Sequence, residues 1–264
     1  MRTLDNFRFG GLVTGLLVGL LASCDAAPPE NGPAGAASGP QVVATNTVLA
    51  NLAETVAGDE AEVKGLLAPG DDPHIYEPTP RDTVVLEEAD IVFYNGYNLE
   101  PELTRIIEGT SVTAETVALA ERIEPLSFQY DGQTEPDPHV WGDVENAIAL
   151  TEGIRDTLIA VDPEAAATYR ANAAAQIADL TRQDGWIETQ IATIPADQRL
   201  LVTTHDAFQY YTTAYGLEML GTLIGISTEE QPSAQTVQQL VEAIKAAGVP
   251  AIFAETTINP QLIS

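Results

Sequence analysis

The sequence predicts an α/β protein of two parallel-sheet βα lobes joined by one long helix. From Gln41 onward, short β-branched runs alternate with helical patterns, which is typical of parallel βαβ units. One uninterrupted helical pattern over 163–194 divides this alternation into two parts. Hydrophobic residues make up 45% of the 264 residues and charged residues 19%, which is typical of a globular protein.

The first lobe is predicted over residues 41–162. Its first helix ends at Gly58, and its second begins after Thr79, where Pro80 takes the first helical position and Asp82 completes a capping box. Strands are expected at 42–45, 62–67, 90–94 and 113–119. Helices are expected at 48–57, from 80 onward, at 99–108 and at 144–160.

The segment 163–195 is predicted to be the linking helix. It contains no proline between Pro163 and Ile194, so the helix can continue without a break. At 1.5 Å per residue it would extend over roughly 45 Å, which is longer than one lobe needs. Its apolar residues recur at helical spacing as one stripe, formed by Tyr169, Ala173, Ile177, Leu180, Ile187, Ile191 and Ile194.

The second lobe is predicted over 196–264, where the alternation resumes. Strands are expected at 200–203, 218–223 and 251–254. Helices are expected at 207–215, ended by Gly216, and at 233–247, ended by Gly248. The sequence ends where the next helix should form, so we expect a second lobe that is incomplete at its C-terminus.

The first 40 residues have the pattern of an export signal. Arg2 and Arg8 precede an uncharged run that ends in Leu21-Ala22-Ser23-Cys24, too short to span a bilayer comfortably. This ending resembles the bacterial lipoprotein signal, so we expect a signal peptide over 1–23 and lipidation of Cys24. An ordinary signal with an incidental cysteine is the alternative. The Ala-, Pro- and Gly-rich segment 24–40 is then a flexible tether, and the folded part lies outside the cytoplasmic membrane, in the periplasm or on the outer face.

Charge and cysteine content exclude several classes of protein. The formal net charge of −28 repels nucleic-acid phosphates and anionic lipids, so no nucleic-acid partner is expected. The acidic surface favours solubility, including in high salt, over a direct part in cation binding. The single cysteine excludes an internal disulfide framework and a Cys-rich zinc or iron–sulfur site.

The three histidines of the chain predict a metal site. His74 and His139 each end an Asp-Pro-His sequence, and His205 directly follows the strand expected at 200–203. All three fall in loops, and ligands of parallel α/β sheets bind in loops beyond the strand ends. A single surface histidine usually has no functional role, but three such settings favour one shared zinc site, with a fourth position open to a carboxylate or water. Metal binding should then weaken as the pH falls towards the imidazole range.

A set of local motifs carries a family resemblance. These are Asp72-Pro73-His74-Ile75-Tyr76-Glu77-Pro78-Thr79-Pro80, Asn95-Gly96 with Leu99-Glu100, Pro138-His139-Val140-Trp141, His205-Asp206-Ala207-Phe208 with Tyr215-Gly216-Leu217, and Phe253-Ala254-Glu255. Together, from about Val42 to the end, they resemble the zinc and manganese receptors, substrate-binding lipoproteins, of bacterial metal ABC importers.

This resemblance implies two α/β lobes, a rigid long helix between them and a metal ion in the cleft between the lobes. It implies that His74 and His139 are ligands from the first lobe and that His205 is the third ligand, from the second lobe. A histidine at position 205 is similar to the zinc-binding members, whereas glutamate is usual in the manganese-selective ones, so Zn²⁺ is expected and Mn²⁺ is the alternative. The family's fourth ligand, an aspartate, has no counterpart before Ser264. The expected partner is a membrane permease driven by a separate ATPase, and the receptor is expected to be a monomer.

Three carboxylates near the histidines are further candidates. Asp143 and Asp206 could orient an imidazole through its second nitrogen, although helix capping is the commoner role. Glu255 could form a salt bridge or support an imidazole from behind rather than bind the ion itself. No phosphate-binding loop, Gly-x-Ser-x-Gly elbow or His-Glu-x-x-His helix occurs, so an enzyme is not expected. A surface adhesin and a three-histidine zinc enzyme remain the alternatives.

Overall fold

The computed structural model describes residues 39–109, 112–130 and 133–256. The expected signal peptide at 1–23, the expected lipidation site Cys24 and all but the last two residues of the expected tether at 24–40 lie outside the described residues. In the described part of the chain, no helix is long and apolar enough to cross a bilayer.

The first sheet confirms the predicted parallel α/β architecture. It contains β1 (Gln41–Ala44), β2 (Glu62–Gly65), β3 (Ile91–Tyr94) and β4 (Glu115–Ala118), in the order β2-β1-β3-β4. All neighbouring strands pair in parallel. The strand that follows β1 in the chain, β2, lies on one side of β1, and the next strand, β3, lies on its other side. The strand order therefore reverses between β1 and β3, and the carboxyl ends of these two strands form the switch point at which such sheets bind ligands.

Helices cover both faces of this sheet. On one face are α1 (Thr47–Ala57), α4 (Val144–Val161) and α5 (Ala166–Ala192), while α2 (Pro80–Glu87) and α3 (Pro101–Gly109) cover the other. Because side chains alternate along a strand, Val42 and Ile91 pack in the core with α1 and α4, whereas their neighbours Val43 and Val92 pack with α2 and α3. The two central strands, β1 and β3, are therefore mostly apolar along their length, as expected of strands that are buried on both faces, whereas the edge strands β2 and β4 are partly exposed.

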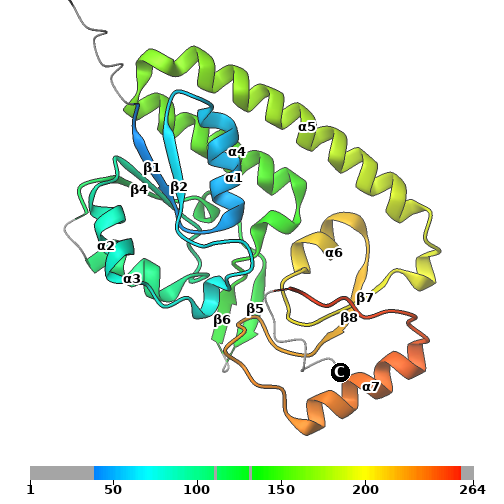
Figure 1. Cartoon of the computed structure of the whole chain (residues 1–264). Helices are drawn as coiled ribbons and strands as arrows, with labels where there is room; N and C mark the ends of the chain where they lie inside the picture. The colour runs from blue at the N-terminus through cyan, green and yellow to red at the C-terminus, as the bar shows by residue number, and fades with distance from the viewer. Residues whose placement is uncertain (1–38, 110–111, 131–132, 257–264) are drawn as a thin grey trace, which may run out of the picture. The chain divides into compact units, whose positions relative to one another are not determined.

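The long helix is also confirmed. A 3₁₀ turn over Pro163–Ala165 leads into α5 (Ala166–Ala192), which has 27 residues. Figure 1 shows α5 passing from α1 and α4 to α6 (Gln209–Tyr215), and α5 contacts all three helices. Asn172 of α5 donates to the Val56 carbonyl at 3.1 Å, and Asp184 of α5 accepts from the hydroxyl of Tyr215 in α6 at 2.7 Å.

The second sheet follows α5 and has two parallel strands among the described residues. These are β7 (Leu200–Thr203) and β8 (Glu218–Thr222), accompanied by α6 (Gln209–Tyr215) and α7 (Ala234–Ala247). Gly216 and Gly248 end the two helices in left-handed backbone, at φ of 67° and 68°. The strand expected at 251–254 is wrong, because only Phe253 pairs, in a single bridge with Thr203.

An antiparallel hairpin follows the first sheet in the sequence and precedes α4. Its strands are β5 (Ser127–Tyr130) and β6 (Gln133–Pro136), and the sequence prediction missed both. A signal was available, because Asp-Gly is one of the most favoured two-residue hairpin connections and the sequence has it at 131–132. The hairpin leads directly into the Asp-Pro-His sequence of His139, so it helps to place that residue.

Candidate metal centre

The structure brings the three histidines together. His74 lies in a 3₁₀ turn (Pro73–Ile75) after β2, His139 immediately precedes a second 3₁₀ turn (Val140–Gly142), and His205 follows β7. Each histidine contributes one ring nitrogen to a cluster, and these three nitrogens all lie within 4.8 Å of one another. All three residues are buried, with only 6%, 2% and 7% of their surface exposed.

The repeated Asp-Pro-His sequence folds in the same way at both positions. Asp72 accepts a hydrogen bond from the backbone N–H of His74 at 3.0 Å, and Asp137 accepts the equivalent bond from His139 at 2.9 Å. The intervening proline fixes its own φ and so limits the conformations of the turn. Each aspartate therefore fixes the backbone of its histidine, and Asp72 also caps the 3₁₀ turn that contains His74.

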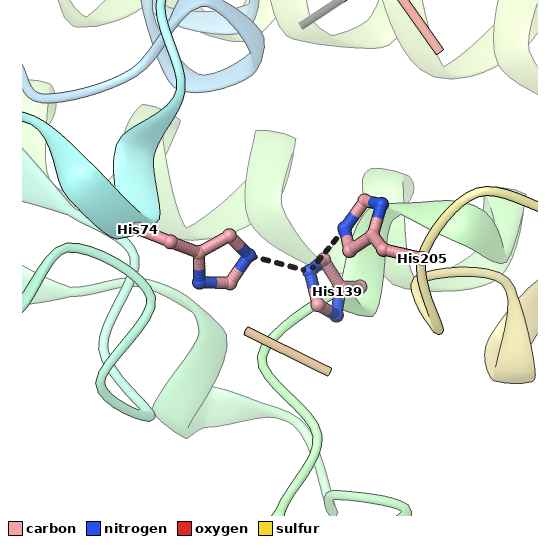
Figure 2. A group of neighbouring side chains, drawn as sticks. All are labelled: His74, His139 and His205. Atoms are coloured by element: carbon pink, nitrogen blue, oxygen red, sulfur yellow. Dashed lines mark hydrogen bonds between the residues drawn. The ribbon is translucent and has the colours of Figure 1, made fainter. Parts of the chain in front are cut away.

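Figure 2 shows the three imidazoles facing one another, with the Nε2 atom of His139 in the middle. This atom lies 3.1 Å from Nε2 of His74 and 3.4 Å from Nε2 of His205. In a tetrahedral zinc site with Zn–N bonds of 2.0–2.1 Å, neighbouring nitrogens are about 3.3 Å apart. The separations therefore fit three nitrogen ligands of one small divalent ion.

Carboxylates hold the opposite nitrogen of two of these rings. Oδ1 of Asp137 lies 2.9 Å from Nδ1 of His139, and the Glu255 carboxylate contacts Nδ1 of His205. A carboxylate accepts a hydrogen bond from a ring N–H, so both rings keep the proton on Nδ1 and turn the Nε2 lone pair towards the cluster. Converging lone pairs repel each other, and a cation between them turns this repulsion into attraction.

Burial keeps His74 and His139 in the neutral form that binds metal. Desolvation, together with the neighbouring His139 and His205, lowers the pKa of His74 from 6.5 to about 3. Desolvation also lowers the pKa of His139, although Asp137 acts in the opposite direction. Metal ligands must be deprotonated, so these rings need not release a proton at neutral pH before binding an ion.

The predicted carboxylates have different roles in the structure. Glu255 is beside an imidazole, and it also accepts hydrogen bonds from the Thr204 hydroxyl and from the backbone N–H of His205, the latter at 3.1 Å. Asp143 instead caps α4 by accepting from Glu145 N–H at 2.8 Å. Asp206 accepts from the side chain of Gln209, and burial raises its pKa.

Asp137 is the carboxylate that sequence reasoning missed. It is 1% exposed, and its Oδ1 serves both the backbone N–H and the ring Nδ1 of His139. The signal was the identical spacing of Asp72 before His74 and of Asp137 before His139. The sequence analysis instead proposed Asp143, which follows His139, as a residue that could orient an imidazole.

Residues that follow β1 and β3 of the first sheet hold the turn that carries His139. Asn95, at the end of β3, donates from its side chain to the Pro138 carbonyl at 2.9 Å. The backbone N–H of Asn95 and the hydroxyl of Thr45, at the end of β1, both donate to the buried carboxylate of Glu100. The switch point between β1 and β3 thus holds the residue that precedes His139.

The histidines line a cavity of about 390 Å³, whose walls also include Trp141 and Phe208. The Trp141 ring lies 5.5 Å from the His139 ring and helps to exclude water. His74 also lines a neighbouring cavity of about 770 Å³, whose walls carry Glu108, Glu121, Glu135 and Glu229. Carboxylates along such a wall raise the local concentration of cations near the cluster.

Comparison with known proteins places the chain in a family. The protein family described as "Zinc-uptake complex component A periplasmic" matches residues 42–264. The chain belongs to this family. Among solved structures, the chain is similar to the periplasmic zinc-binding protein TroA from Treponema pallidum, with a TM-score of 0.81 and 32% sequence identity, over 86% of this chain and 81% of TroA.

Relatives in this family are named for different metals. The manganese-binding lipoprotein MntA of Halalkalibacterium halodurans is 33% identical over 259 residues, covering 98% of this chain and 83% of that protein. The iron-binding protein YfeA of Yersinia pestis is 35% identical over 237 residues, covering 89% of this chain and 75% of that protein. The family therefore includes proteins named for zinc, manganese and iron.

Proposed function

We propose that this protein is an extracytoplasmic receptor that binds a divalent metal ion between His74, His139 and His205 and delivers it to the permease of an ABC importer. The convergence of three buried Nε2 atoms, two of them on rings whose Nδ1 faces a carboxylate, is the observation that carries the proposal. Membership of a family of transport components supports the delivery step. The ion is the cargo of the protein, so the site must release it as well as hold it.

Zinc is the metal that we propose. Three imidazoles with a water or a carboxylate in the fourth position form an ordinary zinc site, whereas manganese prefers oxygen ligands. The nitrogen separations of 3.1 and 3.4 Å also suit the short bonds of zinc. Manganese is the alternative, because several relatives are named for it.

The expected location follows from the leader sequence and the relatives. Relatives including MntA and PsaA of Streptococcus pneumoniae are named as lipoproteins, which supports a lipid anchor on Cys24. We propose that the folded part acts as a monomer beside the membrane, with the lobes at 41–162 and 196–264 and the linking helix at 163–195. Durable anchoring needs two or more acyl chains, which a diacylated cysteine provides.

Elemental analysis of the gently purified protein, followed by competitive titration with zinc and manganese, tests the proposal. The variants His74→Ala, His139→Ala and His205→Ala should each weaken zinc binding by about a hundredfold or more, because each removes one metal bond. Asp143→Ala is the matched control, since it removes a carboxylate close to His139 in sequence that caps α4. It should lower stability and leave zinc affinity unchanged.

The delivery step needs a second measurement. A strain that lacks this protein should lose high-affinity zinc uptake, and the wild-type gene should restore it while the His139→Ala gene should not. Unchanged zinc affinity in the three histidine variants would reject the proposed site. Normal uptake in the deletion strain would reject the transport role.

A further inference from the structure

The hydroxyl of Tyr210 joins the segment that carries His205 to the turn that carries His139. Tyr210 lies in α6, five residues after His205, and only 4% of it is exposed. Its hydroxyl donates a hydrogen bond to the Asp137 carbonyl at 3.0 Å and accepts one from the backbone N–H of Leu126, also at 3.0 Å. Burial raises the pKa of Tyr210 to about 12, so the hydroxyl keeps its proton at neutral pH.

These two bonds place the hydroxyl inside the hairpin ladder. Ser127 pairs with Pro136 in the hairpin, so Leu126 and Asp137 are the next opposing residues. The Asp137 N–H donates to the Leu126 carbonyl at 2.8 Å, as expected of such a pair. In place of the reciprocal bond from Leu126 N–H to the Asp137 carbonyl, both groups bond to the Tyr210 hydroxyl.

The inserted hydroxyl fixes the residue that orients His139. Asp137 has its N–H and its carbonyl held by Leu126 and Tyr210, while its Oδ1 holds the backbone N–H and the ring Nδ1 of His139. A shift of the Asp137 backbone would therefore move the carboxylate and tilt the imidazole. Metal ligands depend on such supporting contacts for their orientation.

Close packing beside the site keeps α6 in this position. A Cβ atom on Gly142, in the turn after His139, would lie 3.2 Å from the backbone nitrogen of Tyr211 and 3.5 Å from the Tyr210 Cβ. The turn and the helix are thus nearly in backbone contact. The segment from His205 to Tyr211 consequently supplies one imidazole and, through the Tyr210 hydroxyl, supports another.

We propose that Tyr210 is a positioning residue for metal binding, which holds Asp137 in place inside the hairpin and thereby aims the His139 imidazole at the ion. This inference rests on the three-histidine site proposed above. The hydrogen bond from Tyr210, on the segment that carries His205, to Asp137, in the turn that carries His139, then helps to set the orientation of a metal ligand. Tyr210 does not touch the ion, so its effect must pass through His139.

The test is the variant Tyr210→Phe, which keeps the ring in place and removes the hydroxyl. Its zinc affinity should fall by about tenfold, the lower end of the effect of losing a contact that supports a ligand. The visible absorption spectrum of bound Co²⁺, which reports coordination geometry, should change with it. Tyr215→Phe is the matched control on the same helix, because its hydroxyl bonds to Asp184 of α5. That variant should keep the wild-type affinity and Co²⁺ spectrum.

A double-variant cycle separates positioning from general loss of stability. In a His139→Ala background, Tyr210→Phe should cause no further loss of zinc affinity, because the ring that it supports is gone. In a His74→Ala background, the tenfold loss should remain. Thermal unfolding of each metal-free variant confirms that it is folded at the temperature of the titration.

The outcomes distinguish this inference from the proposed function. If His139→Ala weakens zinc binding but Tyr210→Phe does not, the site stands and the positioning role of Tyr210 is rejected. An equal loss from Tyr210→Phe with and without His139 also rejects it, since the effect then does not pass through that ring. If His139→Ala leaves zinc affinity unchanged, both the site and the positioning role are rejected.

Discussion

His139 and His205 are both supported by a carboxylate, but the two carboxylates reach them in different ways. Asp137 comes two residues before His139 in the same turn, and its side chain is 1% exposed. Glu255 comes fifty residues after His205 and has a side chain that is 18% exposed. It follows a segment that pairs with β7 only through the single bridge at Phe253.

This difference suggests that the two halves of the site are preorganised to different degrees. The Asp137 contact is local, so forming the turn already brings the carboxylate and the imidazole together. The Glu255 contact must close a loop of about fifty residues, and only a few bonds hold that loop at the site. We therefore expect the His139 side to be rigid and the His205 side to adapt when the ion enters or leaves.

The largest expected effect concerns pH and the stability of the metal-free protein. The pKa of His74 and of His139 is lower in the folded state than the unfolded value of about 6.5. The unfolded chain therefore takes up protons first as the pH falls, so the stability from these neutral rings is present above about 6.5 and is lost below it. The His74 ring should cost up to about 1.4 kcal/mol of unfolding free energy per pH unit between pH 6 and 5, and the His139 ring should add a loss in the same direction.

Urea unfolding at several pH values in the presence of a chelator measures this loss. His74→Gln, which cannot titrate, should show a shallower decline than the wild type by about 1.4 kcal/mol per pH unit. Parallel curves for the two proteins would contradict the burial of a neutral His74. Zinc binding should still weaken as the pH falls, but because the pKa of His74 and of His139 is lowered, the loss between pH 7.5 and 5.5 should be far smaller than the roughly thousandfold expected of three ordinary imidazoles.

The next largest effect should come from the local carboxylate. Asp137→Ala leaves both the backbone N–H and the ring Nδ1–H of His139 without their acceptor in a buried place, so zinc affinity should fall by about a hundredfold. Asp72→Ala is the matched control, because Asp72 occupies the same position before His74 and accepts from its backbone N–H. A competitive zinc titration should show a much smaller loss for Asp72→Ala. Equal losses would mean that the ring contact of Asp137 adds nothing.

The features that sequence predicted are the local ones. The four strands of the first sheet, the helix start at Thr79, the helix ends at Gly216 and Gly248 and the three histidines follow from periodicity, capping residues and loop position, and the structure has each of them. These signals lie within a few residues of the feature that they specify. The Asp-Pro-His turn belongs to the same class, and it would have identified Asp137.

The features that sequence did not predict depend on contacts between distant segments. The Tyr210 hydroxyl reaches a residue 73 positions earlier, and its place in the hairpin ladder depends on strands that must already be paired. The strand expected at 251–254 has the right apolar residues, but among the described residues it pairs only at Phe253. β-Propensity describes how well a residue fits a sheet, whereas a strand also needs a partner along its length.

The smallest expected effect comes from the distant carboxylate. Glu255→Ala should weaken zinc binding by about tenfold, because it frees the Nδ1 side of His205 but leaves this side chain near water, which can replace part of the lost hydrogen bonding. Burial acts to raise the pKa of Glu255, but its interactions with His205 and Thr204 outweigh burial and lower it. The conservative variant Glu255→Gln should therefore recover only part of the affinity. If Glu255→Ala costs as much as Asp137→Ala in the same titration, the two halves of the site are equally preorganised and the proposed difference between them is wrong.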